Sequence, residues 1–352
     1  MRSKSKREDG SVAADLLALS EIVERFQGKR VVVLGDFVAD SFQYGEITRV
    51  SREAPVLILR HRETHTLPGG GANAANNFVA LGARITPVTV VGDDPAGEWL
   101  VRAFRERNVD VSGIIRIKGA VTPTKTRFLA GWAHTASHQV LRVDYEPATL
   151  IGASGQAKIQ SLLRSKLRKA DALAISDYGF GVATPETVRG ALRQRKGNVP
   201  VTLDSRYHLM AYKRAGVTSA TPNEPEIESL HNTSIGQNLV KLESSGRQVL
   251  RKLNLRSLII TRGKDGMAVF QPGQPTVHIP VHGSDQAVDV TGAGDTVLAA
   301  YTLGLASGAS PVESAHIANI AGGLVVMKRG TATVSREELL EEIRKAASEV
   351  AS

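Results

Sequence analysis

The stretch Asp289–Thr296, with the sequence DVTGAGDT, leads into an apolar run that extends to Leu305. Gly292 and Gly294 let the backbone turn tightly and bring its N–H groups close to an anion. The apolar run predicts a buried helix, so these donors would lie at a helix N-terminus, where unpaired N–H groups and the dipole favour phosphate. Asp295 would repel phosphate and is better suited to act as a general base. The alternative is an ordinary strand-to-helix turn in which Asp295 is the N-cap.

Length and composition fit a globular enzyme built from one large α/β domain or two smaller ones. The chain has 352 residues, of which 42% are hydrophobic and 22% charged, and it contains no cysteine. The lack of cysteine excludes disulfides, thiolate catalysis and cysteine-based zinc sites. No apolar run approaches the roughly 18 residues of a membrane span, and the polar start is unlike a secretory signal. We therefore expect a cytoplasmic protein with no membrane partner.

The net charge of +9 raises the question of a nucleic-acid partner. The basic residues are, however, spread along the chain without a block of like charges, and aromatic residues make up only 5%. The stacking platforms of single-strand binders are therefore not evident. We expect no nucleic-acid partner and attribute the basic charge to an enzyme that handles several phosphate groups.

Apolar runs typical of buried strands alternate with helical patterns along most of the chain. A polar tail extends to about Gly10, residues 11–27 predict an amphipathic helix, and residues 28–346 predict the main domain. The predicted strands cover Arg30–Asp36, Ile85–Val91, Ala172–Ser176, Val199–Leu203 and Ser257–Thr261. The predicted helices cover Ala72–Leu81, Gly97–Arg107, Gly155–Lys169, Pro185–Arg195 and, at the end, Ser335–Val350. This alternation predicts a doubly wound, mostly parallel α/β sheet flanked by helices.

Polar residues recur where the predicted strands end. In a doubly wound sheet, ligands bind beyond the carboxyl ends of the strands. Five residues lie at or just after such ends, and we expect them to meet at one edge: Asp36, Asp177, Asp204, Thr261 and Asp289.

Two segments, residues 41–67 and 113–145, interrupt this rhythm with short alternating stretches. They predict a small antiparallel sheet built from two insertions, which would act as a lid or as a clasp between subunits. A single-layer sheet needs its apolar face covered by substrate or by a second subunit, so a homodimer through this lid is expected. The alternative is that these segments add edge strands to the main sheet.

A second glycine cluster, Pro68–Asn77 with the sequence PGGGANAANN, precedes a helix of small residues. Its glycines permit a close approach of backbone to ligand, and Asn73 offers both a donor and an acceptor to a hydroxyl group. The cluster does not fit G-x-G-x-x-G, and the chain has no G-x-x-x-x-G-K-[ST] motif, so dinucleotide and Walker-type nucleotide loops are excluded.

Together, the two glycine motifs resemble the two signatures of the PfkB carbohydrate kinases, the ribokinase-like family. The resemblance covers about Arg30 to Glu338 and implies a ribokinase-like fold. Within the family, the chain is most similar to the D-glycero-β-D-manno-heptose 7-phosphate kinases of lipopolysaccharide core synthesis. The stretches that carry this likeness include Gly35–Asp40, Arg49–Ser51, Leu141–Asp144, Thr221–Asn223 and Lys328–Ser335.

The resemblance implies ATP-dependent phosphoryl transfer to a sugar hydroxyl. Asp295 would take the hydroxyl proton, and the N–H groups of Gly292, Ala293 and Gly294 would stabilise charge on the transferring group. Asn223 and Glu226 would hold Mg²⁺ through waters, although alone they equally suit a helix N-cap with a first-turn acid.

The resemblance also implies two binding sets. Residues expected at the sugar are Asp36, Asp40, Gly70, Gly71, Asn73 and Asp204. Residues expected at ATP are Asn223, Thr261, Gly263, Gly266, Asn319 and Gly322, with Gly292 and Gly294. For the two aspartates Asp36 and Asp40, strand-end capping is an equal alternative, and Asn319 and Gly322 alone read as helix-packing residues.

A heptose 7-phosphate would need cations at its far end, which a free sugar would not. Arg127 and Arg206 are the main candidates, with Arg49, Lys125 and Arg142, and each taken singly also suits a solvated surface charge. The chain departs from the heptose kinases in four places. Phe180 stands where a lysine is usual, and in Asp204–Tyr207 Arg206 would replace a lysine. The other two departures are Ser41 and residues 130–137. No H-x-G-H motif of a nucleotidyltransferase occurs. A ribokinase- or fructokinase-like activity and a catalytically idle sugar or nucleotide sensor remain alternatives.

Overall fold

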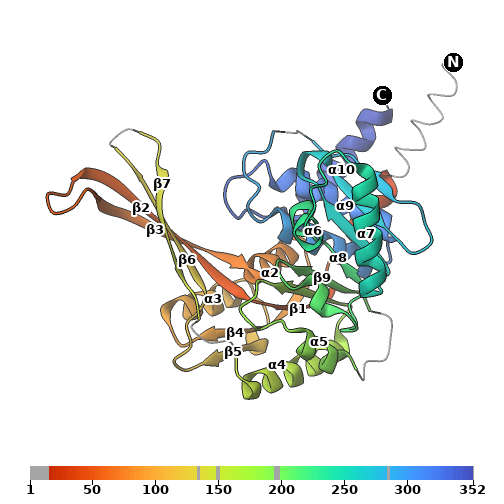
Figure 1. Ribbon diagram of the computed structural model, residues 1–352, viewed down its shortest axis with the longest axis horizontal. Helices are drawn as coiled ribbons and strands as arrows, with labels where there is room; N and C mark the ends of the chain where they lie inside the picture. The colour runs from red at the N-terminus through yellow and green to blue at the C-terminus, as the bar shows by residue number, and fades with distance from the viewer. Residues whose placement is uncertain (1–15, 133–134, 148–150, 194–198, 284–285, 352) are drawn as a thin grey trace.

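A computed structural model describes residues 16–132, 135–147, 151–193, 199–283 and 286–351 of the chain. Two sheets organise this part, one inside the body of the molecule and one projecting from it (Figure 1). The larger sheet has the strand order β13-β12-β11-β10-β9-β8-β1-β4-β5. Its strands are β1 (Arg30–Gly35), β4 (Arg84–Gly92), β5 (Ile114–Ile117), β8 (Ala172–Asp177), β9 (Val201–Ser205), β10 (Ser219–Ala220), β11 (Ser257–Thr261), β12 (Met267–Phe270) and β13 (Val277–Ile279).

The pairing from β5 to β11 is parallel throughout, and β12 and β13 continue the sheet as antiparallel strands. β1 shows why this sheet forms. After Arg30, its sequence VVVLG is buried on both faces, as expected for a strand inside a parallel sheet. Val31 and Val33 contribute to one hydrophobic cluster, and Val32 and Leu34 to another on the opposite face. The predicted doubly wound, mostly parallel fold is confirmed.

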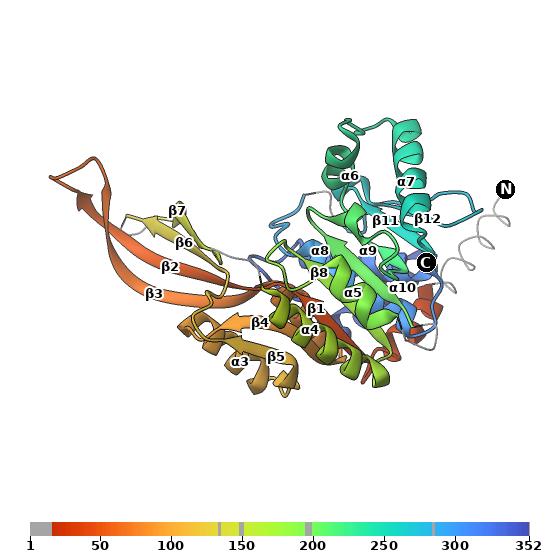
Figure 2. The ribbon, with the colours of Figure 1, turned by 60° about the horizontal axis from the view of Figure 1, so that its bottom comes forward.

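Helices cover both faces of the large sheet. One face is covered by α2 (Gly71–Ala80), α3 (Pro95–Glu106), α8 (Ala293–Ala306), α9 (Pro311–Val325) and α10 (Arg336–Ala351). The other is covered by α4 (Ala153–Lys166), α5 (Pro185–Leu192), α6 (Glu224–His231) and α7 (Leu239–Leu253), of which α4 and α5 face the reader in Figure 2. No helix of the described ranges is long and apolar enough to cross a membrane.

The smaller sheet has the order β3-β2-β6-β7, and we refer to it as the lid after its predicted role. It consists of β2 (Phe37–Val50), β3 (Leu57–Gly70), β6 (Thr124–Gly131) and β7 (His138–Tyr145). β2 pairs antiparallel with β3, and β6 with β7, but β2 and β6 run parallel. β2 follows β1 after a single residue and β3 leads directly into α2, so the lid is continuous with the edge where the strands of the large sheet end.

Three boundaries differ from the sequence-based expectations. β5 lies within the predicted lid segment 113–145 but pairs with β4 in the large sheet. β9 starts and ends two residues later than predicted, and its end at Ser205 places Asp204 inside the strand. Asp289 does not follow a strand among the described residues, because β13 ends at Ile279, ten residues before it. Residues 16–24 are helical, and the predicted polar tail lies outside the described residues.

Candidate active site

The glycine loop and α8 place Asp295 in the first turn of a buried helix. Gly292 is the N-cap with φ +82°, and a Cβ there would lie 2.6 Å from Nδ2 of Asn73, so only glycine fits. The N–H of Ala293 donates to the carbonyl of Val290 at 3.2 Å, which makes it less available to a ligand than the following donors. The N–H groups of Gly294 and Asp295 lie in the first turn, where a helix offers no internal acceptor. Asp295 is therefore not the N-cap but the third residue of α8.

The carboxyl group of Asp295 is buried and held by two donors. Nδ2 of Asn73 donates to Oδ2 at 2.7 Å, and the hydroxyl of Tyr178 lies 3.4 Å from Oδ1. Burial raises the pKa of Asp295 to about 7, against the opposing effect of these two hydrogen bonds. A carboxyl group that titrates near neutral pH at a helix N-terminus is well suited to take a proton from a hydroxyl group.

A chain of buried amides supports Asn73 from behind. The hydroxyl of Thr296 donates to Oδ1 of Asn77 at 2.7 Å. Nδ2 of Asn77 in turn donates to the carbonyl oxygen of Asn73 at 2.9 Å and lies 3.4 Å from its Oδ1. This direction of donation fixes the amide of Asn73 with its NH₂ group toward Asp295. The chain joins α2 to α8, and neither Asn77 nor Thr296 was identified from the sequence.

The Gly70–Gly71 pair and Asp36 shape the edge of the sheet beneath the carboxyl group of Asp295. Gly70 has φ +54°, and a Cβ there would lie 2.8 Å from Cγ2 of Val38, while the N–H of Gly71 donates to the carbonyl of Asp36 at 2.9 Å. The carboxyl group of Asp36 accepts the N–H groups of Tyr178, Phe180 and Val182 at 2.9–3.0 Å. Burial raises its pKa to about 6.

Asp36 therefore anchors the segment that carries Tyr178, and its oxygens are largely occupied by backbone. These contacts realise the strand-end capping alternative, and a direct contact of Asp36 with a sugar stays a prediction. Asp177, at the end of β8, is similarly occupied by the hydroxyl groups of Ser205 and Tyr212 at 2.8 and 3.1 Å.

The lid presents Asp40 and a group of cations to the same region. Oδ1 of Asp40 accepts Nη1 of Arg127 at 2.7 Å, and both side chains are largely buried. Lys125 lies opposite Asp40 in the β2–β6 register, and its Nζ is 5.7 Å from the ring centre of Tyr178. Burial lowers the pKa of Lys125, with the charge of Asp40 acting in the opposite sense. Lys125 makes no ion pair with the residues that the structure describes, so its charge remains open to a ligand.

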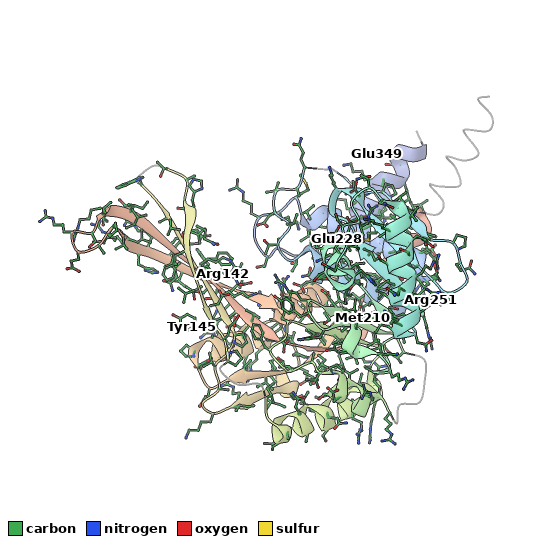
Figure 3. The ribbon with its side chains drawn as sticks, viewed as in Figure 1. Arg142, Tyr145, Met210, Glu228, Arg251 and Glu349 are labelled. Carbon is green, nitrogen blue, oxygen red and sulfur yellow. The ribbon has the colours of Figure 1, made fainter. Side chains whose placement is uncertain are left out.

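The remaining candidate cations differ in position. Arg142 lies opposite Arg127 on β7 but binds Asp144 with two hydrogen bonds of 2.6 and 2.7 Å; it is labelled on the lid in Figure 3. Arg206 is exposed after β9 and lies over the ring of Tyr207. Arg49 is nine residues beyond Asp40 along β2, which is about 30 Å in an extended strand, so it lies outside this group.

The predicted metal pair forms a reciprocal cap at the start of α6. Oδ1 of Asn223 accepts the N–H of Glu226 at 2.8 Å, and Oε2 of Glu226 accepts the N–H of Asn223 at 3.0 Å. The capping alternative is thus realised, while both residues also line a pocket of about 670 Å³.

Asp204 lines the same pocket as this cap. The pKa of Asp204 is raised well above its usual range by burial and then by the charge of Glu226, with Asp295 and Asp177 adding to the effect. Such a surplus of negative charge fits a divalent cation. The described residues contain no cluster of three side chains with metal-binding geometry, so waters and phosphate oxygens would complete the shell.

This pocket continues into a smaller, more apolar one. Thr261, Val290 and Gly294 line both, and the second pocket has a volume of about 180 Å³. The second pocket contains the other residues predicted to bind ATP: Gly263, Gly266, Asn319 and Gly322. Gly266 has φ +76°, and a Cβ there would overlap the carbonyl of Ile279. A polar chamber beside an apolar slot suits a molecule with phosphates at one end and a flat base at the other.

Comparison with known proteins agrees with this geometry. Residues 29–338 match the pfkB family of carbohydrate kinases. The bifunctional protein HldE of Geobacter metallireducens is 38% identical over 312 residues, which are 88% of this chain and 62% of that protein. HldE of Mesorhizobium japonicum is 36% identical over 323 residues, 91% of this chain and 63% of that protein. The chain thus spans about three fifths of the length of these curated relatives.

Solved structures of low sequence identity share the fold. Phosphofructokinase-2 from Escherichia coli, in complex with potassium, has a TM-score of 0.71 at 18% identity, covering 92% of this chain and 99% of that one. Ribokinase from Arabidopsis thaliana, complexed with ribose and ATP, has a TM-score of 0.66 at 19% identity, covering 90% and 99%. With its buried Asp295 between a glycine loop and a lid, the chain belongs to the PfkB family of carbohydrate kinases, which are phosphotransferases with an alcohol group as acceptor.

Proposed function

We propose that the chain transfers the γ-phosphoryl group of ATP to D-glycero-β-D-manno-heptose 7-phosphate at its anomeric hydroxyl, giving the 1,7-bisphosphate for lipopolysaccharide core precursor synthesis in the cytoplasm. The observation that carries the kinase assignment is the position of Asp295. Its buried carboxyl group has a pKa of about 7 and lines the larger polar pocket beside the glycine loop.

In the proposed reaction, the anomeric oxygen attacks the γ-phosphorus, the bond from that phosphorus to the β-phosphate oxygen breaks, and ADP leaves. The hydroxyl proton passes to Asp295, which Asn73 and Tyr178 hold in orientation. The free N–H groups at the start of α8 face the charge that develops on the transferring group.

ATP would lie along the two joined pockets, with its phosphates near Gly292 and Gly294 and its base in the slot by Asn319 and Gly322. Asn223, Glu226 and Asp204 would hold Mg²⁺, mostly through waters. A bound Mg²⁺ would neutralise phosphate charge and orient the donor. The ion would also offset the repulsion from neighbouring carboxylates, which adds to burial in raising the pKa of Asp204.

Cations on the lid and after β9 support a phosphate at the far end of the acceptor. Lys125 and Arg206 make no ion pair within the described residues, whereas Arg127 and Arg142 are already matched by Asp40 and Asp144. The relatives at 33–38% identity carry the name HldE. The sequence resembles the kinase part of these heptose enzymes, which supports a heptose as the acceptor.

The test is a screen for ADP release over phosphorylated and free sugars. We expect the highest kcat/KM with heptose 7-phosphate and a large loss with the unphosphorylated heptose. Lys125→Ala should raise KM for the phosphorylated sugar more than for a free one. Activity confined to free sugars would instead support a ribokinase- or fructokinase-like enzyme, and no turnover with any sugar would support a sensor.

We further propose that the chain forms a homodimer through the lid. Leu141 and Tyr145, each 55% exposed, alternate with Arg142 and Asp144 on β7 and so lie on the face of the lid opposite Lys125. Paired apolar side chains on a single-layer sheet are best covered by a second copy of the same sheet.

A further inference from the structure

A large basic cavity lies at the other end of the parallel sheet, away from Asp295. It has a volume of about 830 Å³, within the range of small-molecule sites, and it is built around the first residues of β1 and β4. β1 runs from Arg30 in the cavity wall to Gly35 at the active-site edge, about 17 Å of extended chain. The cavity is therefore separate from the sugar and ATP pockets.

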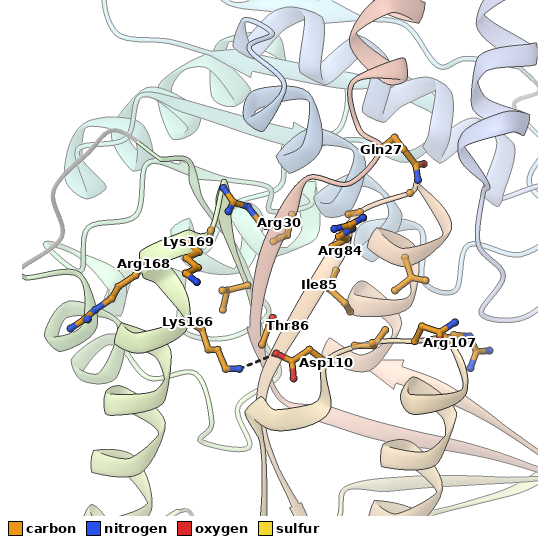
Figure 4. A pocket seen from close by; sticks show the side chains of 18 of the residues that line it. Gln27, Arg30, Arg84, Ile85, Thr86, Arg107, Asp110, Lys166, Arg168 and Lys169 are labelled. Carbon is orange, nitrogen blue, oxygen red and sulfur yellow. Dashed lines mark hydrogen bonds and ion pairs between the residues drawn. The ribbon is translucent and has the colours of Figure 1, made fainter.

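Cations surround this cavity. In Figure 4, Lys166, Arg168 and Lys169 line one side and Arg84 and Arg107 the other, with Arg30 above. They come from the end of α4 and the turn η2 (Leu167–Lys169), from the starts of β1 and β4 and from the residue after α3.

Few acids balance these charges. Asp110 is the acidic residue of the cavity wall, and it pairs with Lys166 at 2.9 Å, while Arg30 is matched by Asp171 at 2.9 Å. The guanidinium group of Arg107 has the carbonyl of Ala103, in its own helix, as its one hydrogen-bond partner among the described residues. The other three cations, Arg84, Arg168 and Lys169, form no ion pair or side-chain hydrogen bond within the described part of the chain.

Helix dipoles do not account for the surplus. α2, α3 and α4 end near the cavity, and each C-terminus carries about half a negative charge. Three such ends offset roughly 1.5 of the four positive charges that lack an acidic partner, so the cavity keeps a net positive charge of about 2.5. The apolar wall formed by Val31, Val79 and Ile85 closes the cavity behind these cations.

We propose that this cavity binds a small ligand carrying two or more phosphate groups. Its concave shape, with cations on opposite walls, fits a compact polyanion better than a flat or extended one, and arginine fork geometry suits phosphate oxygens. The proposal does not depend on which sugar the kinase phosphorylates, because the two sites share no residue.

Titration calorimetry with inorganic pyrophosphate, in metal-free buffer, tests the proposal on the full chain. The Arg84→Ala/Lys169→Ala variant should weaken one binding event by at least about tenfold, since two charge-assisted contacts are lost. Both side chains are exposed, so folding should be retained, and the Arg107→Ala/Arg168→Ala variant should repeat the effect. A second binding event that keeps its affinity in both variants belongs to the active site. The KM of both variants for ATP should equal that of the wild type.

The matched control removes two exposed lysines elsewhere, Lys158→Ala/Lys252→Ala, with the same change in net charge. It should bind pyrophosphate as the wild type does. Equal weakening in the control, or a wild-type isotherm that neither double variant alters, would overturn the proposal. Tighter binding of single-stranded DNA or of anionic phospholipid vesicles, lost in the Arg84→Ala/Lys169→Ala variant, would replace the small ligand with a macromolecular partner.

Discussion

At the scale of single residues, the chemistry depends on the carboxyl group of Asp295. Asp295→Asn keeps the shape of the side chain but removes the base, so kcat should fall by about 10²–10⁴ while ATP affinity stays nearly unchanged. Single-turnover kinetics and ATP binding by calorimetry measure the two effects separately. Asp93→Asn, at an exposed carboxyl group, is the matched control and should be fully active. Near-normal turnover of Asp295→Asn would disprove the assignment.

The pKa of Asp295 makes activity and stability depend on pH in opposite directions. The base must be ionised, so kcat/KM should rise with pH and level off above about pH 7. The folded protein holds this proton more tightly than an unfolded chain, whose aspartates titrate near 3.9, so stability should fall as pH rises from about 4 to 7.

Asp295→Asn removes that stability loss, which is at most about 4 kcal/mol for a pKa shift of this size. The Tm of the variant relative to the wild type should therefore increase from pH 4 to pH 8. A difference in Tm that does not vary with pH would contradict the raised pKa.

At the scale of elements, α2 and α8 are coupled by the amide chain from Thr296 to Asn73. Thr296→Val leaves Oδ1 of Asn77 buried without its donor, which should cost about 1–3 kcal/mol of stability. The loosened Asn73 should orient Asp295 less well, lowering kcat by about tenfold and moving the acidic limb of the pH profile upward. Thr302→Val is the control on the same helix, because its buried hydroxyl bonds Leu298 and Thr202 instead. It should lose stability without moving the pH profile.

The same elements show what a sequence can and cannot predict. The buried runs and the Gly-rich turns are local signals, so the parallel sheet, α2, α8 and the position of Asp295 were predictable. The pairing of Thr296 with Asn77 joins residues 219 positions apart, and the occupation of Asp36 by the backbone of Tyr178 depends on the folded edge. Short strands such as β5 carry too few residues to reveal which sheet they join, which explains the error at the lid boundary.

At the scale of the whole molecule, the lid raises the question of what covers its outer face. Leu141 and Tyr145 project there from β7, on the far side from Lys125 and Asp40, and a second lid is the surface of matching size and polarity. Light scattering should give about twice the mass of the 37.6 kDa chain for the wild type. Leu141→Glu/Tyr145→Glu should shift this mass to that of the monomer, because two charges from each subunit would be buried in the interface.

Val240→Glu, which places one glutamate on an exposed apolar residue of α7, should leave the dimer intact. Because β2 and β6 carry Asp40 and Lys125 on the other face, separating the two lids should also loosen the sugar side. We therefore expect the monomeric variant to show a raised KM for the sugar and an unchanged KM for ATP. A monomeric wild type at micromolar concentration, or a dimer that survives both glutamates, would show that the outer face of the lid is not the interface.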